Sequence, residues 1–130
     1  MRIAFIAALS VIAAPAFANA AEDWVEIART DTGGIIYVDN GSLQRSGNVV
    51  QGVEKWDHRN DTDAKHRMIV IRAAYDCRAR SYRIKSADFT DVDGQPPETY
   101  NWTEAESTFQ PIEKGSIAES ILDHVCARTQ

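Results

Sequence analysis

Residues 67–77 read RMIVIRAAYDC and contain the clearest strand pattern in the sequence. Every second side chain from position 69 onward is apolar or sulfur-bearing: Ile69, Ile71, Ala73, Tyr75 and Cys77. Side chains two positions apart share one face of a strand, so this set is predicted to face the core. Arg72 and Asp76 fall on the other face. The pattern therefore predicts a strand that buries Cys77 on its core side.

The residues on either side extend this strand into an antiparallel sheet. In residues 81–89, Tyr82 and Ile84 alternate with Arg83 and Lys85, which is typical of an antiparallel strand with one solvated face. β-Branched and aromatic residues predict the remaining strands at 24–28, 35–38, 48–56 and 99–102. Residues 42–46 are predicted to form one helical turn.

The C-terminal segment has helical periodicity. Ser116 and Glu119 have the spacing of a capping box at a helix start. An apolar stripe follows at helical spacing, with His124 on the polar side facing solvent. The stripe consists of Ile117, Ala118, Ile121, Leu122 and Val125. Cys126 lies at its edge and can reach the face of the sheet that carries Cys77.

These patterns predict an α+β fold, a single antiparallel sheet of about six strands with a C-terminal helix packed on one face and tied by a disulfide. Cys77 and Cys126 are the only cysteines, and an even number in an exported chain favours a disulfide over two free thiols. Closing a loop of about 50 residues is worth about 4 kcal/mol on the chain-entropy account.

The N-terminus has the pattern of a cleavable signal peptide. Arg2 precedes an apolar run over residues 3–14, which is too short to span a bilayer, and small residues follow. Cleavage is predicted between Ala20 and Ala21, which leaves residues 21–130 as one domain. No cysteine lies near this site and no second apolar run follows, so neither a lipid anchor nor a membrane span is expected. The periplasm is the expected compartment, with the cell surface or the exterior as alternatives.

The charge balance argues against two classes of partner. The chain has 14 Lys and Arg residues against 19 Asp and Glu residues, a formal net charge of −5, and removal of Arg2 with the leader makes it −6. Nucleic acid and anionic lipid both favour clustered positive charge. We therefore expect neither as a general partner.

Few residues suggest chemistry. His58, His66 and the carboxylates of loop 57–66 could hold a metal, but their spacing matches no standard ligand pattern, and a solvated loop explains them better. Residues 91–94 resemble the start of a calcium loop but lack its closing glutamate, which favours a turn. No catalytic motif is present. The sequence predicts a protein that is not an enzyme and has no cofactor or metal.

Two surface features are open to interpretation. The first is a basic hairpin formed by Arg78, Arg80, Arg83 and Lys85. It is either a solvated hairpin or a contact site for an anionic partner. The second is the set of tryptophans at strand ends, which either close corners of the core or form a binding rim. They are Trp24, Trp56 and Trp102.

Several short motifs together resemble the surface-adhesin protein E-like domains of Gram-negative bacteria. They lie at residues 24–27 (WVEI), 36–39 (IYVD) and 42–47 (SLQRSG), in the strand ending at residues 75–77 (YDC), and at the helix end, residues 125–126 (VC). The resemblance covers nearly the whole chain after the leader.

This resemblance implies a six-stranded antiparallel sheet, a helix tied to it by a disulfide, and a non-enzymatic binding role in the cell envelope. The founding adhesin attaches to host matrix and serum proteins, and has been linked to haem binding and to dimers. We therefore expect a binding module for a host matrix or envelope protein, with a homodimer among its assemblies. The alternatives are a periplasmic carrier of haem or a metal, and an envelope accessory domain without a ligand.

Overall fold

In the computed structural model, residues 22–90 and 95–129 are described, and they contain an eight-stranded sheet and one α-helix. The predicted leader and its cleavage site, and the predicted turn at 91–94, lie outside the described residues. The elements are β1 (Trp24–Arg29), β2 (Ile35–Asp39), the 3-10 turn η1 (Asn40–Ser42), β3 (Gln44–Ser46), β4 (Val49–Asp57), β5 (Met68–Asp76), β6 (Ser81–Thr90), β7 (Glu98–Asn101), β8 (Gln110–Pro111) and α1 (Ile117–Arg128).

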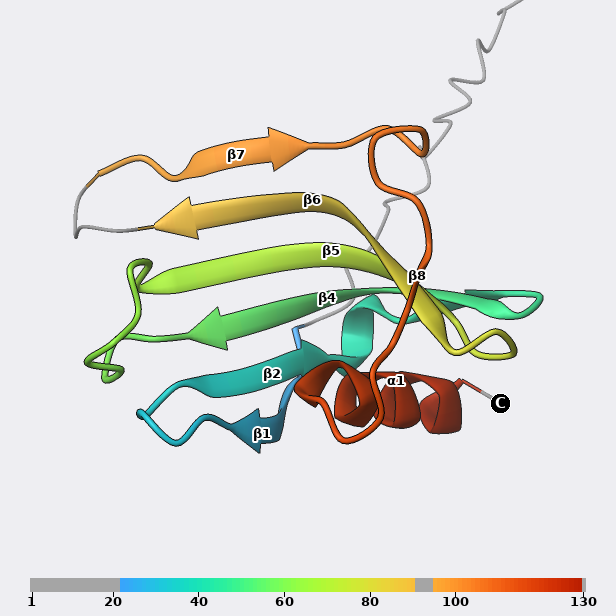
Figure 1. Cartoon of the computed structure of the whole chain (residues 1–130), viewed down its shortest axis with the longest axis horizontal. Coiled ribbons are helices and arrows are strands. Elements are labelled where there is room, and N and C mark those ends of the chain that lie inside the picture. The colour runs from blue at the N-terminus through green and yellow to red at the C-terminus, as the bar shows by residue number, and fades with distance from the viewer. Residues whose placement is uncertain (1–21, 91–94, 130) are drawn as a thin grey trace, which may run out of the picture.

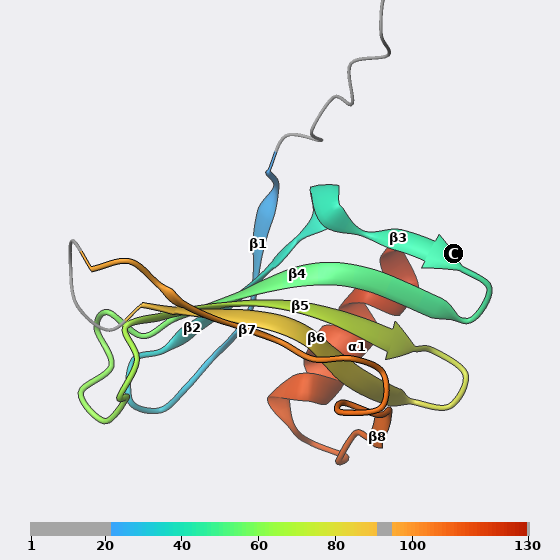
Figure 2. The same ribbon diagram turned by 90° about the horizontal axis from the view of Figure 1, so that it is seen from above.

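Every strand pairing is antiparallel. The order across the sheet is β1-β2-β4-β5-β6-β7, while β3 pairs with β4 and β8 pairs with β6 beside this path (Figure 1). Figure 2 shows α1 lying against one face of the sheet and crossing the strands. The predicted α+β fold of about six strands with one C-terminal helix is confirmed.

The alternation in residues 67–77 correctly predicted the core face of β5. Ala73 and Tyr75 are buried, and Ile71 and Cys77 pack against the same cluster. The helix contributes the predicted stripe, with Ile121, Leu122 and Val125 fully buried. The core thus lies between α1 and the central strands.

Both ends of α1 are fixed by side chains. The predicted disulfide between Cys77 and Cys126 is present and ties the last turns of α1 to the end of β5. At the first turn, the backbone N–H of Glu119 donates to Ser116 Oγ at 3.2 Å, and Glu119 Oε1 accepts from the N–H of Gly115 at 3.1 Å. This reciprocal arrangement satisfies backbone donors that the helix itself leaves unpaired.

Local structure departs from the predictions at three places. Residues 42–46 do not form a helical turn; the chain makes η1 and then β3, because β4 offers a strand partner for residues 44–46. The short strand β8 was not predicted at all. His124 is half-buried rather than solvent-facing, because its Nε2 atom lies 2.7 Å from Asn40 Oδ1.

No helix among residues 22–90 and 95–129 has the length and hydropathy needed to cross a membrane.

Candidate binding surfaces

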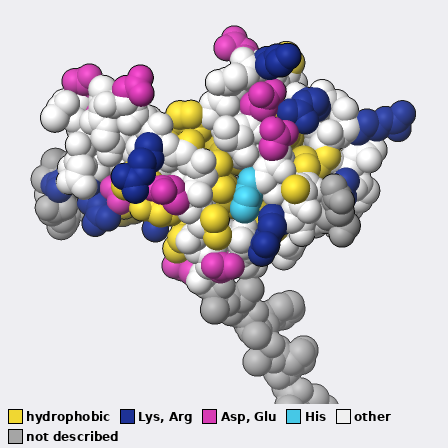
Figure 3. Space-filling view, turned by 90° about the horizontal axis from the view of Figure 1, so that it is seen from below, with side chains coloured by type: hydrophobic (Ala, Val, Ile, Leu, Met, Phe, Trp, Pro, Cys, Tyr) yellow, Lys and Arg dark blue, Asp and Glu magenta, His cyan; other side chains and the backbone are white. Residues whose placement is uncertain are grey.

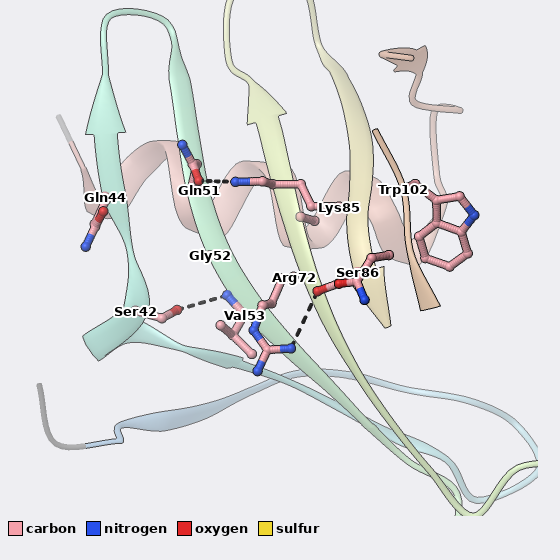
Figure 4. A pocket seen from close by; sticks show the side chains of 11 residues that line it. Ser42, Gln44, Gln51, Gly52, Val53, Arg72, Lys85, Ser86 and Trp102 are labelled. Atoms are coloured by element: carbon pink, nitrogen blue, oxygen red, sulfur yellow. Dashed lines mark hydrogen bonds between the residues drawn. The ribbon is translucent and has the colours of Figure 1, made fainter. Parts of the chain in front are cut away.

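The face of the sheet opposite α1 is hollowed, and no helix within residues 22–90 and 95–129 covers it. A cavity of about 380 Å³ lies over the middle of this face, which we call the open face (Figure 4). Polar, cationic and aromatic side chains border it and come from η1, from β3 to β6, from the end of β7 and from the residue that follows β7. The lining residues are Ser42, Gln44, Gln51, Gly52, Val53, Arg72, Ala73, Lys85, Ser86, Asn101 and Trp102.

A β-bulge places two consecutive side chains on the open face. Ala73 pairs with Ile84 and Arg72 pairs with Ser86, so Lys85 has no partner across β5. Adjacent residues of a regular strand point to opposite faces, whereas a bulge turns an extra side chain toward one face. Lys85 and Ser86 therefore both border the same cavity.

The two cations of the open face differ in their partners. Arg72 NH1 lies 3.3 Å from Asp88 Oδ2, so part of its charge is balanced on the surface. Lys85 Nζ donates instead to the neutral Gln51 Oε1 at 2.6 Å (Figure 4). Among the described residues, no carboxylate forms an ion pair with Lys85. The positive charge of Lys85 on this face is therefore not balanced by a carboxylate of the described residues.

Aromatic rings border the edge of the sheet beside this cavity. Trp102 stacks on Tyr100 with ring centres 6.0 Å apart, and Tyr100 meets Phe89 edge-on at 5.6 Å. All residues of β7 are exposed, and Tyr100 is 48% exposed. Exposed tryptophan and tyrosine are common at binding surfaces because they bury a large area with few rotatable bonds.

The four residues of the predicted basic hairpin lie in four different surroundings. Arg78 is exposed at the turn, whereas Arg80 pairs with two carboxylates of α1, those of Glu119 at 3.4 Å and Asp123 at 2.9 Å. Arg83 is buried, and its Nε atom donates to the backbone oxygen of Ser107 at 2.9 Å. Lys85 alone of the four borders the open-face cavity. A role of the four in partner binding stays a prediction.

Charged side chains within the polar loop 57–66 pair with one another. Arg59 pairs with Asp57 at 2.7 Å, and this hydrogen-bonded guanidinium lowers the pKa of Asp57. His58 Nδ1 lies 3.0 Å from Asp61 Oδ2. Within residues 22–90 and 95–129, no three His, Cys, Asp or Glu side chains are grouped so as to hold a metal ion.

A second cavity lies on the helix side of the sheet and is largely apolar. It measures about 280 Å³, and its lining residues are Glu54, Trp56, Ile69, Ile71, Tyr75, Tyr82, Ile84, Ala118 and Ile121. We call it the helix-side cavity. Figure 3, which views the molecule from the side of β1 and α1, shows apolar side chains gathered in a recess between two lobes of the surface.

Among the residues that the structure describes, Glu54 is the one carboxylate that borders the helix-side cavity. Its side chain is buried; Trp56 Nε1 donates to its Oε1 at 2.8 Å, and the Tyr75 hydroxyl donates to its Oε2. Burial raises the pKa of Glu54 to about 7, although the bond from Trp56 acts in the opposite direction. Sequence reasoning did not single out Glu54, although period two places it on the same face as Trp56.

The model of a protein family described as surface-adhesin protein E matches residues 24–127, which confirms the resemblance seen in the motifs. No curated protein and no solved structure matches the chain.

Proposed function

The chain belongs to the surface-adhesin protein E family, and we propose that it is an exported binding module for a polypeptide partner, either a host matrix protein or a protein of the cell envelope. Membership indicates an adhesion or binding role rather than a catalytic one. The family and the disulfide both suggest export. We infer that residues 1–20 act as the signal peptide and that the mature domain works in the periplasm or at the cell surface.

The observation that carries this proposal is the asymmetry of the sheet. One face is covered by α1, while the open face keeps a broad cavity bordered by Arg72, Lys85 and Trp102. An uncovered sheet face with a cation and an indole at its rim has the composition of a protein-binding surface.

The charge of Lys85 favours an acidic segment of the partner. A carboxylate could replace Gln51 as its hydrogen-bond partner, and the indole of Trp102 borders the same cavity for apolar contact. Complementary charge at an interface raises the association rate and selects the partner. We propose an extended, acidic stretch of polypeptide as the bound segment.

Charge reversal at Lys85 tests the open face. Lys85→Glu is expected to weaken binding to immobilised matrix or envelope proteins by about tenfold, because it places like charges opposite each other. Lys114→Glu makes the same charge change at an exposed residue outside the open-face cavity and is expected to bind normally. Surface plasmon resonance of the purified mature proteins measures both.

A third variant separates the open face from the hairpin turn. Arg78→Glu is expected to bind as the wild type does, because Arg78 does not border the open-face cavity. Loss of binding in Arg78→Glu with normal binding in Lys85→Glu would place the contact at the turn and contradict the proposal. Absence of binding to every matrix and envelope protein at micromolar concentration would contradict the binding role itself.

One observation favours the alternative of a haem carrier. A hollow of about 320 Å³ is bordered by His66 and the aromatic rings of Phe89, Tyr100 and Trp102. Imidazole is a ligand of haem iron, and rings suit a flat macrocycle. If the protein carries haem, a titration gives a Soret band that His66→Ala abolishes. A flat absorbance titration eliminates this alternative.

A further inference from the structure

Glu54 is a buried carboxylate without a cation beside it. Glu54 is 6% exposed, and its two hydrogen-bond partners, Trp56 and Tyr75, are both neutral donors. No Lys, Arg or His in the part of the chain that the structure describes forms an ion pair with it. Buried acidic side chains are usually paired with a positive group, because an unpaired charge is costly to remove from water.

In the part of the chain that the structure describes, no other charged side chain lines the helix-side cavity. Val38 of β2 and Ile71 of β5 are its neighbours on the same face. Across the helix-side cavity, β6 contributes Tyr82 and Ile84, and α1 contributes the apolar Ala118 and Ile121. The other titratable groups that line the cavity are therefore the hydroxyls of Tyr75 and Tyr82.

We propose that the helix-side cavity binds a small amine, with an apolar body against α1 and the central strands and a protonated nitrogen on the Glu54 carboxylate. The site is separate from the open face and does not depend on the proposed function.

Three features of the cavity favour this class of ligand. Its lining is apolar apart from Glu54 and the hydroxyl and indole groups beside it, which suits an aliphatic or aromatic body. The carboxylate accepts bonds, so it favours a donor head and disfavours an anionic one. The volume of about 280 Å³ is at the small end for ligand sites, which limits the ligand to about the size of one ring and a short chain.

Burial of the carboxylate adds selectivity for a cation. The pKa of Glu54 is raised to about 7 by desolvation, which reflects the cost of the unpaired charge. An ammonium group would remove that cost, whereas a neutral hydroxyl would offer only a hydrogen bond. Charged hydrogen bonds are stronger than neutral ones, and inside an apolar cavity the difference is larger than in water.

Three probes with the same phenylethyl body test the proposal on the unmodified mature protein. Phenethylamine, 2-phenylethanol and 3-phenylpropionate share a ring and a short chain but carry a positive, a neutral and a negative head. Calorimetry at pH 8 is expected to show the amine binding about tenfold or more tightly than the alcohol, with no binding of the carboxylate. Equal binding of the amine and the alcohol, or no binding of any probe, would overturn the proposal.

Two substitutions locate the site. Glu54→Gln keeps the shape but removes the charge, and is expected to abolish the preference for the amine over the alcohol. Ala118→Leu extends a side chain into the cavity and is expected to abolish binding of both probes. Ala127→Leu makes the same change at an exposed position of α1 and serves as the matched control. Unchanged amine binding in folded Glu54→Gln would show that the carboxylate is not the receptor.

A further variant distinguishes amine binding in the helix-side cavity from binding at the open face. Lys85 lies on the open face and does not line the helix-side cavity, so Lys85→Glu is expected to bind phenethylamine as the wild type does. Loss of amine binding in Lys85→Glu would place the amine on the open face and contradict the assignment.

Discussion

Replacing Cys77 and Cys126 together by alanine is expected to lower the free energy of unfolding by about 4 kcal/mol. The bridge joins residues 49 apart in sequence, so it restricts a long loop of the unfolded chain. It also holds the end of α1, which supplies three fully buried core residues, against β5. Because small domains have only about 5–15 kcal/mol of stability, this loss would remove a large part of it.

Urea denaturation of the double variant, followed by circular dichroism, measures this loss. Wild type reduced by dithiothreitol is expected to unfold at the same lowered midpoint as the variant, since both lack the bridge. The oxidised wild type is the reference for both. A midpoint unchanged from that of the oxidised wild type would show that the bridge contributes nothing to stability.

Glu54→Gln is expected to remove most of a pH dependence of stability between pH 4.5 and 7. The pKa of Glu54 is about 7 in the folded protein, against an ordinary value of 4.5. The folded state therefore holds a proton that the unfolded state releases, and stability falls as the pH rises through this window. The full penalty is about 3 kcal/mol above pH 7 and is absent below pH 4.5.

Urea titrations at pH 5 and pH 8 test this expectation. The wild type should lose stability between the two values, and Glu54→Gln should lose much less. Asp57 and Asp61 have lowered pKa values, which stabilise the fold above pH 3.8, but they are present in both proteins and cancel in the comparison. Glu113→Gln, at an exposed position, should retain the wild-type dependence. If wild type and Glu54→Gln lost the same free energy of unfolding between pH 5 and pH 8, the raised pKa of Glu54 would be contradicted.

The elements with strong periodicity could be predicted from sequence alone. Ile71, Ala73 and Tyr75 follow period two, and Ile121, Leu122 and Val125 follow the helical period, so each core face was assigned correctly. Short local segments could not be assigned this way. Residues 44–46 form β3 because they pair with β4. Three residues are too few to show the alternating pattern from which a strand is predicted.

The binding surfaces depend on tertiary contacts that periodicity does not encode. Arg83 and Lys85 share one face of β6, yet Arg83 is buried by the backbone of Ser107, while Lys85 borders the open cavity. The difference arises from the loop after β7 and from the bulge opposite Ala73. Period two likewise placed the side chain of Glu54 on the helix side of the sheet. That no cation of the described residues pairs with it could not be predicted, because this depends on the side chains that β2, β5, β6 and α1 place around it.

Site-specific photo-crosslinking in the native cells tests the central claim most directly. A photoreactive residue at Gln51 reports contacts of the open face, and the same residue at Asp123, which is exposed on α1, reports contacts of the helix side. We expect a discrete protein adduct from position 51 and none from position 123. Digestion by external protease then shows whether the complex lies at the cell surface or in the periplasm. An adduct from position 123 alone, or from neither position, would contradict a binding module that uses the open face.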